Sequence, residues 1–245
     1  MILKDKVALV TGGSAGIGKA IVIALAEEGC NVIFTYNTNK KASKKLLDKI
    51  HALGVSGLCI KAEMRSQADI MNLFSNIEHE YKKIDILINN VGINRPFDLF
   101  NSNTWRDIFE VNLFSVIACT EKAIKLMGKN GRILNISSVY ADGKACWQGI
   151  PAYGASKAAI NHFTQTLAKN MAPDILVNAI APGYVKTPLW VDATKELFTQ
   201  KGNEQLIERM INPNEIADIA IAVIKNDAMT GEIVVVDGGL RLKTV

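Results

Sequence analysis

Short apolar segments alternate with helical patterns along the chain, and this alternation constrains the fold more than any other feature. Most of the segments are apolar on both faces, as is typical of strands in a parallel sheet with helices on both sides. The expected strands are residues 6–11, 31–36, 57–63, 84–90, 132–138, 175–181 and 232–239. The pattern predicts an α/β fold with a doubly wound parallel sheet of about seven strands and helices on both faces.

Helical patterns fill the intervals between the expected strands. Apolar residues recur at helical spacing from Ile17 to Leu25 and stop before Gly29, a residue type that commonly ends helices. Further helices are expected at about 39–53, 67–81, 102–127 and 152–170. With no low-complexity linker and no repeat, residues 1–245 are expected to form a single domain. Segment 183–212 interrupts the alternation without a strand, which is typical of a substrate lid near strand ends.

Charge and composition argue against several classes of function. The 245 residues are 49% hydrophobic and 21% charged, and the net charge of +4 is too small to indicate nucleic-acid binding. No apolar run reaches the roughly 18 residues of a membrane span, and no signal peptide precedes the first strand. The three histidines share no ligand spacing, so no metal site is predicted.

The cysteines indicate a reducing compartment. Cys30, Cys59, Cys119 and Cys146 are far apart in the sequence and form no C-x-x-C motif. We therefore expect reduced thiols, mostly in the core, in a cytoplasmic protein.

A glycine-rich segment, TGGSAGIG at residues 11–18, follows the first expected strand and opens the first expected helix. Gly12, Gly16 and Gly18 allow a tight turn and a close approach of the backbone to a pyrophosphate. The following helix N-terminus offers free N–H groups. A simple connecting turn could have the same composition, but the strand–loop–helix context favours a dinucleotide-binding, Rossmann-like domain.

Tyr153 and Lys157 are four residues apart in IPAYGASKAAI, which places them on one face of an expected helix. Reduction of a ketone requires a hydride donor and an acid that protonates the developing oxyanion. The usual pKa of tyrosine is about 10, and a neighbouring ammonium favours the anion, so this pair is a candidate acid–base group. Taken alone, the spacing is more typical of helix-surface packing than of a chemical pair.

The order of these motifs resembles that of the short-chain dehydrogenase/reductase family over nearly the whole chain. NNVG at 89–92 stands where the family has Asn-Asn-Ala-Gly, PG at 182–183 matches its nicotinamide-side loop, and VVVDGG at 234–239 matches its last strand. The family's catalytic tetrad matches, in order, Asn112, Ser138, Tyr153 and Lys157. The resemblance implies a nicotinamide-dependent oxidoreductase that interconverts a ketone and a secondary alcohol, usually as a homotetramer or homodimer.

The resemblance also implies a role for each member of the tetrad. Tyr153 is expected to act as the general acid in reduction and as the base in oxidation. Lys157 is expected to lower the pKa of Tyr153 and to bind the nicotinamide ribose, and Ser138 to hold and polarise the substrate oxygen. Asn112 is expected to shape its helix and to hold a water for a proton relay with Lys157. Ser137 should point to the opposite face of its strand from Ser138.

The same resemblance predicts the residues that bind the cofactor. They are Gly12, Ser14, Gly16, Ile17, Gly18, Tyr36, Asn37, Glu63, Met64, Asn90, Gly92, Tyr153, Lys157, Pro182, Gly183, Val185 and Thr187. The second expected strand ends without an acid that would hold a ribose hydroxyl, and Lys40 and Lys41 follow it, so we expect a preference for NADP(H), with NAD(H) as the alternative. Family members that prefer NADP often carry Arg in the glycine loop, where this chain has Ala15.

The stretch 139–152 borders the expected substrate position and is slightly longer than in the acyl-carrier-protein reductases of the family. We therefore expect Trp147 and Gln148 to contact substrate together with Ser138 and Tyr153. Tyr140 lies in the same stretch and is a further specificity candidate.

The motifs are most similar to those of 3-oxoacyl-[acyl-carrier-protein] reductases, which implies a small or carrier-bound ketone as substrate. Lys129 suits contact with an acidic carrier, but Asp174 lies near the position where a second base is expected. A sugar, a ring ketone or another biosynthetic intermediate therefore stays open as the substrate. A non-catalytic dinucleotide sensor is the alternative of another class.

Overall fold

The expected strands form one parallel sheet in the computed structural model, which describes residues 1–95, 99–145, 147, 149–190 and 194–243. They are β1 (Val7–Val10), β2 (Asn31–Tyr36), β3 (Gly57–Lys61), β4 (Ile86–Asn89), β5 (Gly131–Ile136), β6 (Ile175–Pro182) and β7 (Ile233–Val236). The seven strands lie in the order β3-β2-β1-β4-β5-β6-β7. Each neighbouring pair is parallel, which confirms the predicted doubly wound sheet.

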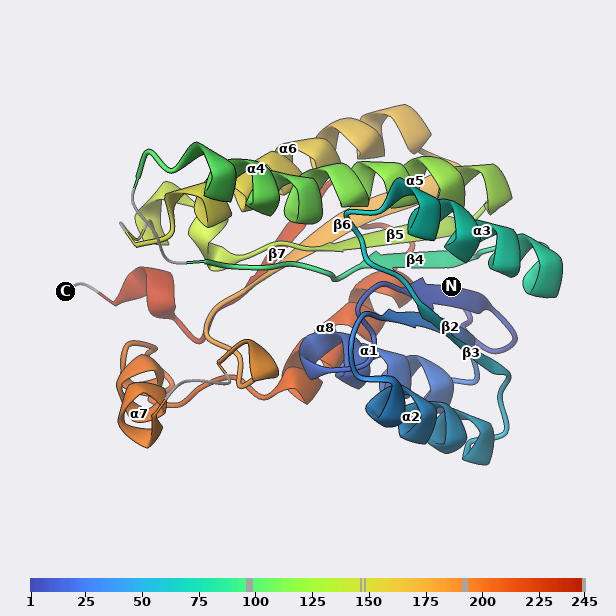
Figure 1. The fold of residues 1–245 in the computed structure, drawn as a ribbon, viewed down its shortest axis with the longest axis horizontal. Helices are drawn as coiled ribbons and strands as arrows, with labels where there is room; N and C mark the ends of the chain where they lie inside the picture. The colour runs from blue at the N-terminus through green and yellow to red at the C-terminus, as the bar shows by residue number, and fades with distance from the viewer. Residues whose placement is uncertain (96–98, 146, 148, 191–193, 244–245) are drawn as a thin grey trace.

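Helices cover both faces of this sheet (Figure 1). One layer contains α1 (Gly16–Glu27), α2 (Lys40–Ala52) and α8 (Pro213–Lys225). The other contains α3 (Gln67–Tyr81), α4 (Ser102–Phe109), α5 (Ser115–Leu126) and α6 (Pro151–Met171). The short helix α7 (Lys195–Asn203) lies away from the sheet, on the side of the molecule where the C-terminus lies.

The strands are apolar on both faces because each face packs against one helical layer. In β1, Ala8 and Val10 belong to the core that includes α1 and α8, whereas Val7 and Leu9 belong to the core that includes α3 and α5. All four side chains are buried. Burial of one large aliphatic side chain contributes roughly 1.5–3 kcal/mol, so a short apolar strand is held firmly between two layers.

The helix expected at residues 102–127 is divided in the structure. A π-helical turn, Glu110–Phe114, separates α4 from α5 and carries Asn112. Single π-turns within helices are rare and often lie at functional sites. Helix α8 was not among the predicted helices.

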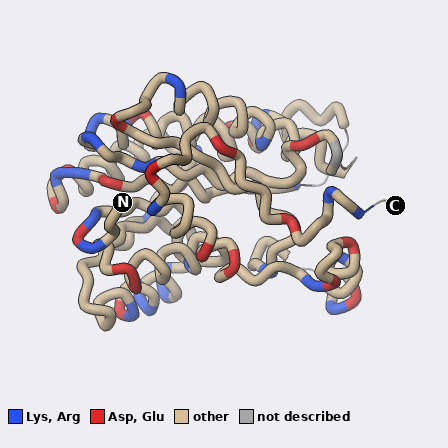
Figure 2. Tube along the Cα trace, turned by 180° about the vertical axis from the view of Figure 1, so that it is seen from behind, with Lys and Arg blue, Asp and Glu red and all other residues tan. Residues whose placement is uncertain are grey.

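Charged residues of both signs are interspersed along the described chain (Figure 2). Within the described residues, no helix combines the length and apolar character needed to cross a membrane. In the same residues, no group of His, Cys, Asp and Glu is arranged to hold a metal ion. Cys30 and Cys119 are buried free thiols and Cys59 is partly buried, whereas Cys146 lies outside the described residues.

Candidate active site

The carboxyl ends of β1 and β4 form the point at which the strand order reverses. The chain passes from β1 to β2 on one side, and β4 is followed by β5 on the other. In doubly wound sheets, ligands bind in the crevice outside the carboxyl ends of the strands at such a point. The glycine loop after β1 and the NNVG segment after β4 therefore meet where a ligand is expected.

The glycine loop adopts a conformation that only glycine tolerates well. Gly12 and Gly16 have φ angles of 64° and 53°, in the left-handed region. A β-carbon at Gly18 would lie 2.5 Å from the Gly12 carbonyl oxygen and 2.5 Å from Asn90 Nδ2. The absence of side chains thus lets the start of α1 approach the loop and leaves its backbone exposed to a ligand.

Asn90 fixes this loop from the neighbouring strand. Its side-chain nitrogen Nδ2 donates to the carbonyl oxygens of Thr11, at 2.9 Å, and Gly12, at 3.2 Å. Its backbone N–H donates to Thr11 Oγ1 at 3.0 Å. The N-cap of α1 is Ala15, whose side chain cannot accept a hydrogen bond, so the first N–H groups of α1 are free to bind an anion. These features fit the pyrophosphate of a dinucleotide.

Asn112 is fully buried and held by three hydrogen bonds. Its Oδ1 accepts from the Ile93 N–H at 2.8 Å, and its Nδ2 donates to the Ile93 carbonyl at 3.0 Å. The same Nδ2 donates to Ser156 Oγ at 3.0 Å, which joins the π-turn to α6. Asn112 therefore sets the position of the chain after β4 relative to the helix that carries Tyr153 and Lys157.

Lys157 lies beneath the Tyr153 ring in the core of the site. Its Nζ is 5.8 Å from the ring centroid and donates to the Ile136 carbonyl at 2.7 Å. A β-carbon at Gly92 would lie 3.3 Å from this Nζ, so the lack of a side chain at Gly92 lets the backbone after β4 lie close to the ammonium. The side chain is 3% exposed, and this burial lowers the pKa of Lys157 to about 8.

Tyr153 is next to Ser138, as the predicted tetrad requires. Burial raises the pKa of the Tyr153 hydroxyl, and a hydrogen bond with the Ser138 side chain opposes this rise. The expected lowering of the Tyr153 pKa by Lys157 is not seen, since burial dominates. Ser137 points the other way, because its Oγ donates to Asn161 Oδ1 at 2.6 Å and to the Lys157 carbonyl. The two serines thus face opposite sides, as the alternation along the strand predicts.

The far end of the crevice lies after β2 and β3. Asn37 Nδ2 donates to Glu63 Oε2 at 2.6 Å, and Glu63 Oε1 lies 3.4 Å from the Arg65 guanidinium. Tyr36 and Met64, on either side of these polar groups, are buried. The Glu63 carboxylate is therefore already engaged by an amide and a cation of the protein.

The segment after β6 returns to the glycine loop. A β-carbon at Gly16 would lie 3.2 Å from the Thr187 side chain, although the two residues belong to opposite ends of the chain. Gly183 packs so closely on Asp237 that a β-carbon would lie 2.8 Å from its backbone. The remaining predicted cofactor residues on these two segments are Ser14, Ile17, Pro182 and Val185, of which Pro182 and Val185 are buried.

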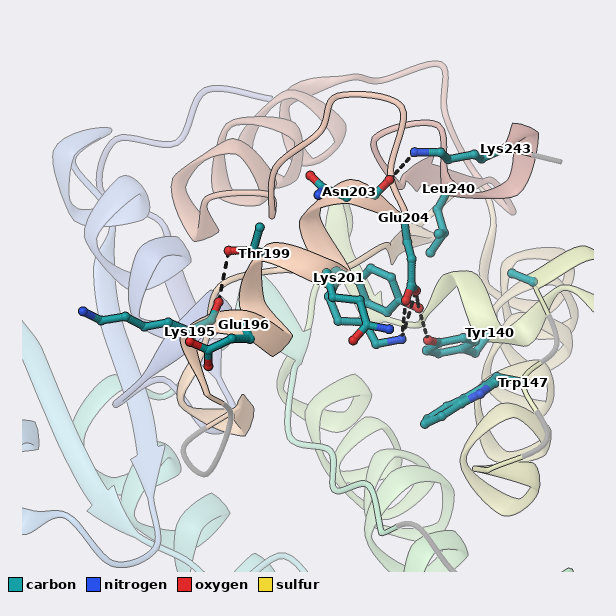
Figure 3. Close-up of a pocket in the computed structure, with 13 residues that line it drawn as sticks. Tyr140, Trp147, Lys195, Glu196, Thr199, Lys201, Asn203, Glu204, Leu240 and Lys243 are labelled. Atoms are coloured by element: carbon teal, nitrogen blue, oxygen red, sulfur yellow. Dashed lines mark hydrogen bonds and ion pairs between the residues drawn. The ribbon is translucent and has the colours of Figure 1, made fainter. Parts of the chain in front are cut away.

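A cavity of about 1070 Å³ opens between α7 and the stretch after β5 (Figure 3). Tyr140 and Trp147 line it from that stretch, and Gln148 lies outside the described residues. Tyr184, Lys201 and Glu204 also line it and were not among the predicted site residues. Lys201 and Glu204 are typical charged residues of a helical surface, so only the fold reveals their position.

Known proteins similar to this chain identify its family. A family model described as short chain dehydrogenase matches residues 6–197. The chain belongs to this family. As a short-chain dehydrogenase it is an oxidoreductase that acts on CH–OH and C=O groups with NAD or NADP.

Relatives of this short-chain dehydrogenase include 3-oxoacyl-[acyl-carrier-protein] reductases. The FabG protein of Aquifex aeolicus is 35% identical, with 97% of this chain and 98% of that protein covered. The Synechocystis 3-oxoacyl-[acyl-carrier-protein] reductase is 34% identical, with 97% and 98% covered. A Burkholderia cenocepacia short chain dehydrogenase solved in complex with NADP has a TM-score of 0.91 and 29% identity, with 98% of this chain and 99% of that chain covered.

Proposed function

We propose that this short-chain dehydrogenase reduces a ketone to a secondary alcohol with NADPH and catalyses the reverse oxidation with NADP. The observation that carries the proposal is the meeting of Ser138, Tyr153 and Lys157 beside the glycine loop, at the carboxyl edge of the sheet. The nicotinamide cofactor would supply the hydride when bound.

The side chains of the site would hold the substrate oxygen, donate the proton and bind the cofactor ribose. Ser138 and Tyr153 hydroxyls lie together and can both hold a carbonyl oxygen, with Tyr153 donating the proton. Burial keeps Tyr153 protonated at neutral pH, which suits the reductive direction. Lys157 can donate from its Nζ to a ribose hydroxyl, and at Gly92 no side chain lies against this Nζ. Asn112 orients the helix that carries Tyr153 and Lys157 through Ser156.

Preference for NADP is supported by the residues at the end of β2. No carboxylate extends from Tyr36 or Asn37, and the nearby Glu63 is engaged by Asn37 and Arg65. A 2′-phosphate would therefore meet little repulsion. A metagenomic blue fluorescent protein of the same fold, solved with NADPH, has a TM-score of 0.92 and 28% identity.

Replacing Tyr153 with Phe tests the assignment. We expect Tyr153→Phe to bind NADPH normally but to lose about a hundredfold or more in kcat, because general acid catalysis typically contributes that much. Wild-type kcat/KM should be higher with NADPH than with NADH. The measurement is oxidation of NADPH over a panel of ketones, with cofactor binding followed by fluorescence. Near-normal kcat in Tyr153→Phe would contradict the acid–base role, and tight NADPH binding without turnover of any ketone would favour a sensor.

A 3-oxoacyl thioester is the second candidate substrate, since relatives are named 3-oxoacyl-[acyl-carrier-protein] reductases. The surface expected to meet an acidic carrier is partly neutralised, because Lys129 Nζ lies 3.9 Å from the Asp174 carboxylate and both are exposed. Rates with acetoacetyl-CoA and with an acetoacetyl carrier protein distinguish the cases. A dedicated carrier-protein reductase should favour the carrier form.

A further inference from the structure

Tyr140 lies between the catalytic tyrosine and a polar network at the cavity wall. Its ring is 6.3 Å from the Tyr153 ring, edge to face, and 6.1 Å from the Tyr184 ring. Trp147 stacks on its other side at 6.5 Å. Tyr140 therefore lines the cavity with its ring against that of Tyr153.

The hydrogen bonds of this network run in one direction only. Lys201 Nζ lies 2.8 and 2.9 Å from the two oxygens of Glu204, so this carboxylate is an acceptor. Tyr184 must then donate its proton to Glu204, at 2.8 Å. Its oxygen in turn accepts from the Tyr140 hydroxyl at 2.7 Å.

The Tyr140 hydroxyl therefore donates its only proton to Tyr184. Its oxygen keeps free lone pairs on the cavity side, and no donor in the described part of the chain is bonded to them. Burial raises the pKa of Tyr140 to about 12 and also raises the pKa of Tyr184, so both remain protonated near neutral pH. Lys201 further fixes the network by lying over the Trp147 and Tyr184 rings, 5.2 and 5.1 Å from their centroids.

On the basis of the ketone reductase function proposed above, we propose that Tyr140 is a specificity residue that accepts a hydrogen bond from a hydroxyl group close to the reacting carbonyl. The preferred substrate class is then a hydroxyketone, or the matching diol in oxidation. A 3-oxoacyl thioester has no donor beside its reacting carbonyl. Tyr184, Glu204 and Lys201 act as positioning residues that set the direction of the Tyr140 proton.

A matched set of open-chain ketones tests this preference. Beside its carbonyl, hydroxyacetone has a hydroxyl that can donate a hydrogen bond. Methoxyacetone, of similar size, has at that place an ether oxygen that can only accept, and butanone has no polar group there. Because one net hydrogen bond contributes about 0.5–1.5 kcal/mol, we expect kcat/KM for hydroxyacetone to exceed that for butanone by about twofold to tenfold. Tyr140→Phe should reduce this ratio to near one, whereas Tyr81→Phe, on α3 outside the site, should leave it unchanged.

Removal of the acceptor that holds the Tyr140 proton gives a sharper test. In Tyr184→Phe the Tyr140 hydroxyl is free to donate into the cavity, so kcat/KM for methoxyacetone should rise relative to kcat/KM for butanone. A change that merely loosened the site would lower all three rates without this reversal.

The outcomes separate this inference from the proposed function. Equal kcat/KM for hydroxyacetone and butanone in the wild type, or a preference that survives Tyr140→Phe, overturns the role of Tyr140 while leaving the reductase intact. If no ketone is reduced, the proposed function fails, and the preference is then measured as binding of the same three compounds to the NADP-loaded protein by calorimetry. Hydroxyacetone binding no tighter than butanone would overturn the inference there too.

Discussion

At the scale of single residues, Lys157 shows how the site depends on burial. Among the described residues its ammonium has one acceptor, the Ile136 carbonyl, and it has little contact with water. A charged group in such a place is less stable than in water, and for this reason the pKa of Lys157 falls to about 8. Gly92 has no side chain to lie against Nζ, so a ligand hydroxyl there would complete the hydrogen bonding of the ammonium.

This burial predicts a pH-dependent cost in stability. Below pH 8 Lys157 is charged in both the folded and the unfolded chain, so the full cost is present. Between pH 8 and the usual lysine value of 10.5 the folded protein releases the proton first, so the cost falls as pH rises. Lys157→Met, without cofactor, should be more stable than wild type at pH 7 by roughly 3 kcal/mol, with a smaller difference at higher pH.

Urea unfolding from pH 7 to 10 measures this difference. Exposed Lys45 on α2 provides the control, because Lys45→Met should give a difference that does not vary with pH. If the difference in the free energy of unfolding between Lys157→Met and wild type were constant from pH 7 to 10, the explanation by a buried charge would be wrong.

The residues of the site were partly predictable from the sequence. Asn112, Ser138, Tyr153 and Lys157 could be named because their order along the chain resembles a known family, and the structure brings the last three together. The order could not give the partners of these groups, because Ile93 and Ile136 contact Asn112 and Lys157 through backbone atoms, which carry no residue-specific signal. The cavity network of Tyr184, Lys201 and Glu204 depends on the path of the segment after β6, which sequence periodicity does not determine.

At the scale of secondary structure, strand positions were predicted well because apolar runs ended at glycine or polar residues. The boundaries of α3 were also predicted correctly, since Ser66 caps it through the Asp69 N–H and Lys82 ends it in the left-handed conformation. The π-turn before α5 has no periodic signal, because one extra residue in a turn barely changes the apolar pattern. Helix α8 did have a signal, since Asn212 and Glu215 form a capping box at its start.

The junction of the glycine loop and α1 gives a prediction at this scale. A methyl group at Gly18 would lie 2.5 Å from both Gly12 O and Asn90 Nδ2, so α1 would have to move away from the loop. We expect Gly18→Ala to lower the free energy of unfolding by about 1–3 kcal/mol and to weaken NADPH binding. Thermal unfolding and cofactor titration measure the two effects.

Gly128→Ala is the matched control, since no described atom lies within 4 Å of its β-carbon position. Equal effects of the two substitutions on cofactor binding would show that the close approach at Gly18 does not shape the ligand site.

At the scale of the whole molecule, one face of the helical layer formed by α3 to α6 remains partly apolar. Phe114, the last residue of the π-turn, and Ile117, in the first turn of α5, are three residues apart and are 49% and 39% exposed. Side chains of this kind on one helix face often contact another subunit. The expected homotetramer or homodimer stays a prediction, with the helices that carry Asn112 and Tyr153 as its interface.

Light scattering coupled to size-exclusion chromatography tests the assembly. We expect the wild type to elute as a dimer or tetramer and Phe114→Glu to shift it toward the monomer, because an unpaired carboxylate is costly to bury. Met71→Glu, at an exposed apolar position on α3, is the control and should keep the assembly. A monomeric wild type, or equal behaviour of both variants, would contradict an interface at α5.

The position of β1 in the middle of the sheet has a consequence for biosynthesis. When the ribosome has released the chain through β3, β1 can pair only with β2, and its other edge is unpaired. Its second partner, β4, begins at Ile86, after the whole of α3 has been made. An unpaired strand edge is a site for wrong pairing, so the nascent chain is most prone to aggregation during this interval. Completion of β4 pairs β1 on both edges and brings Asn90 to the glycine loop, so the central strand and the loop that follows it are secured in the same step of synthesis.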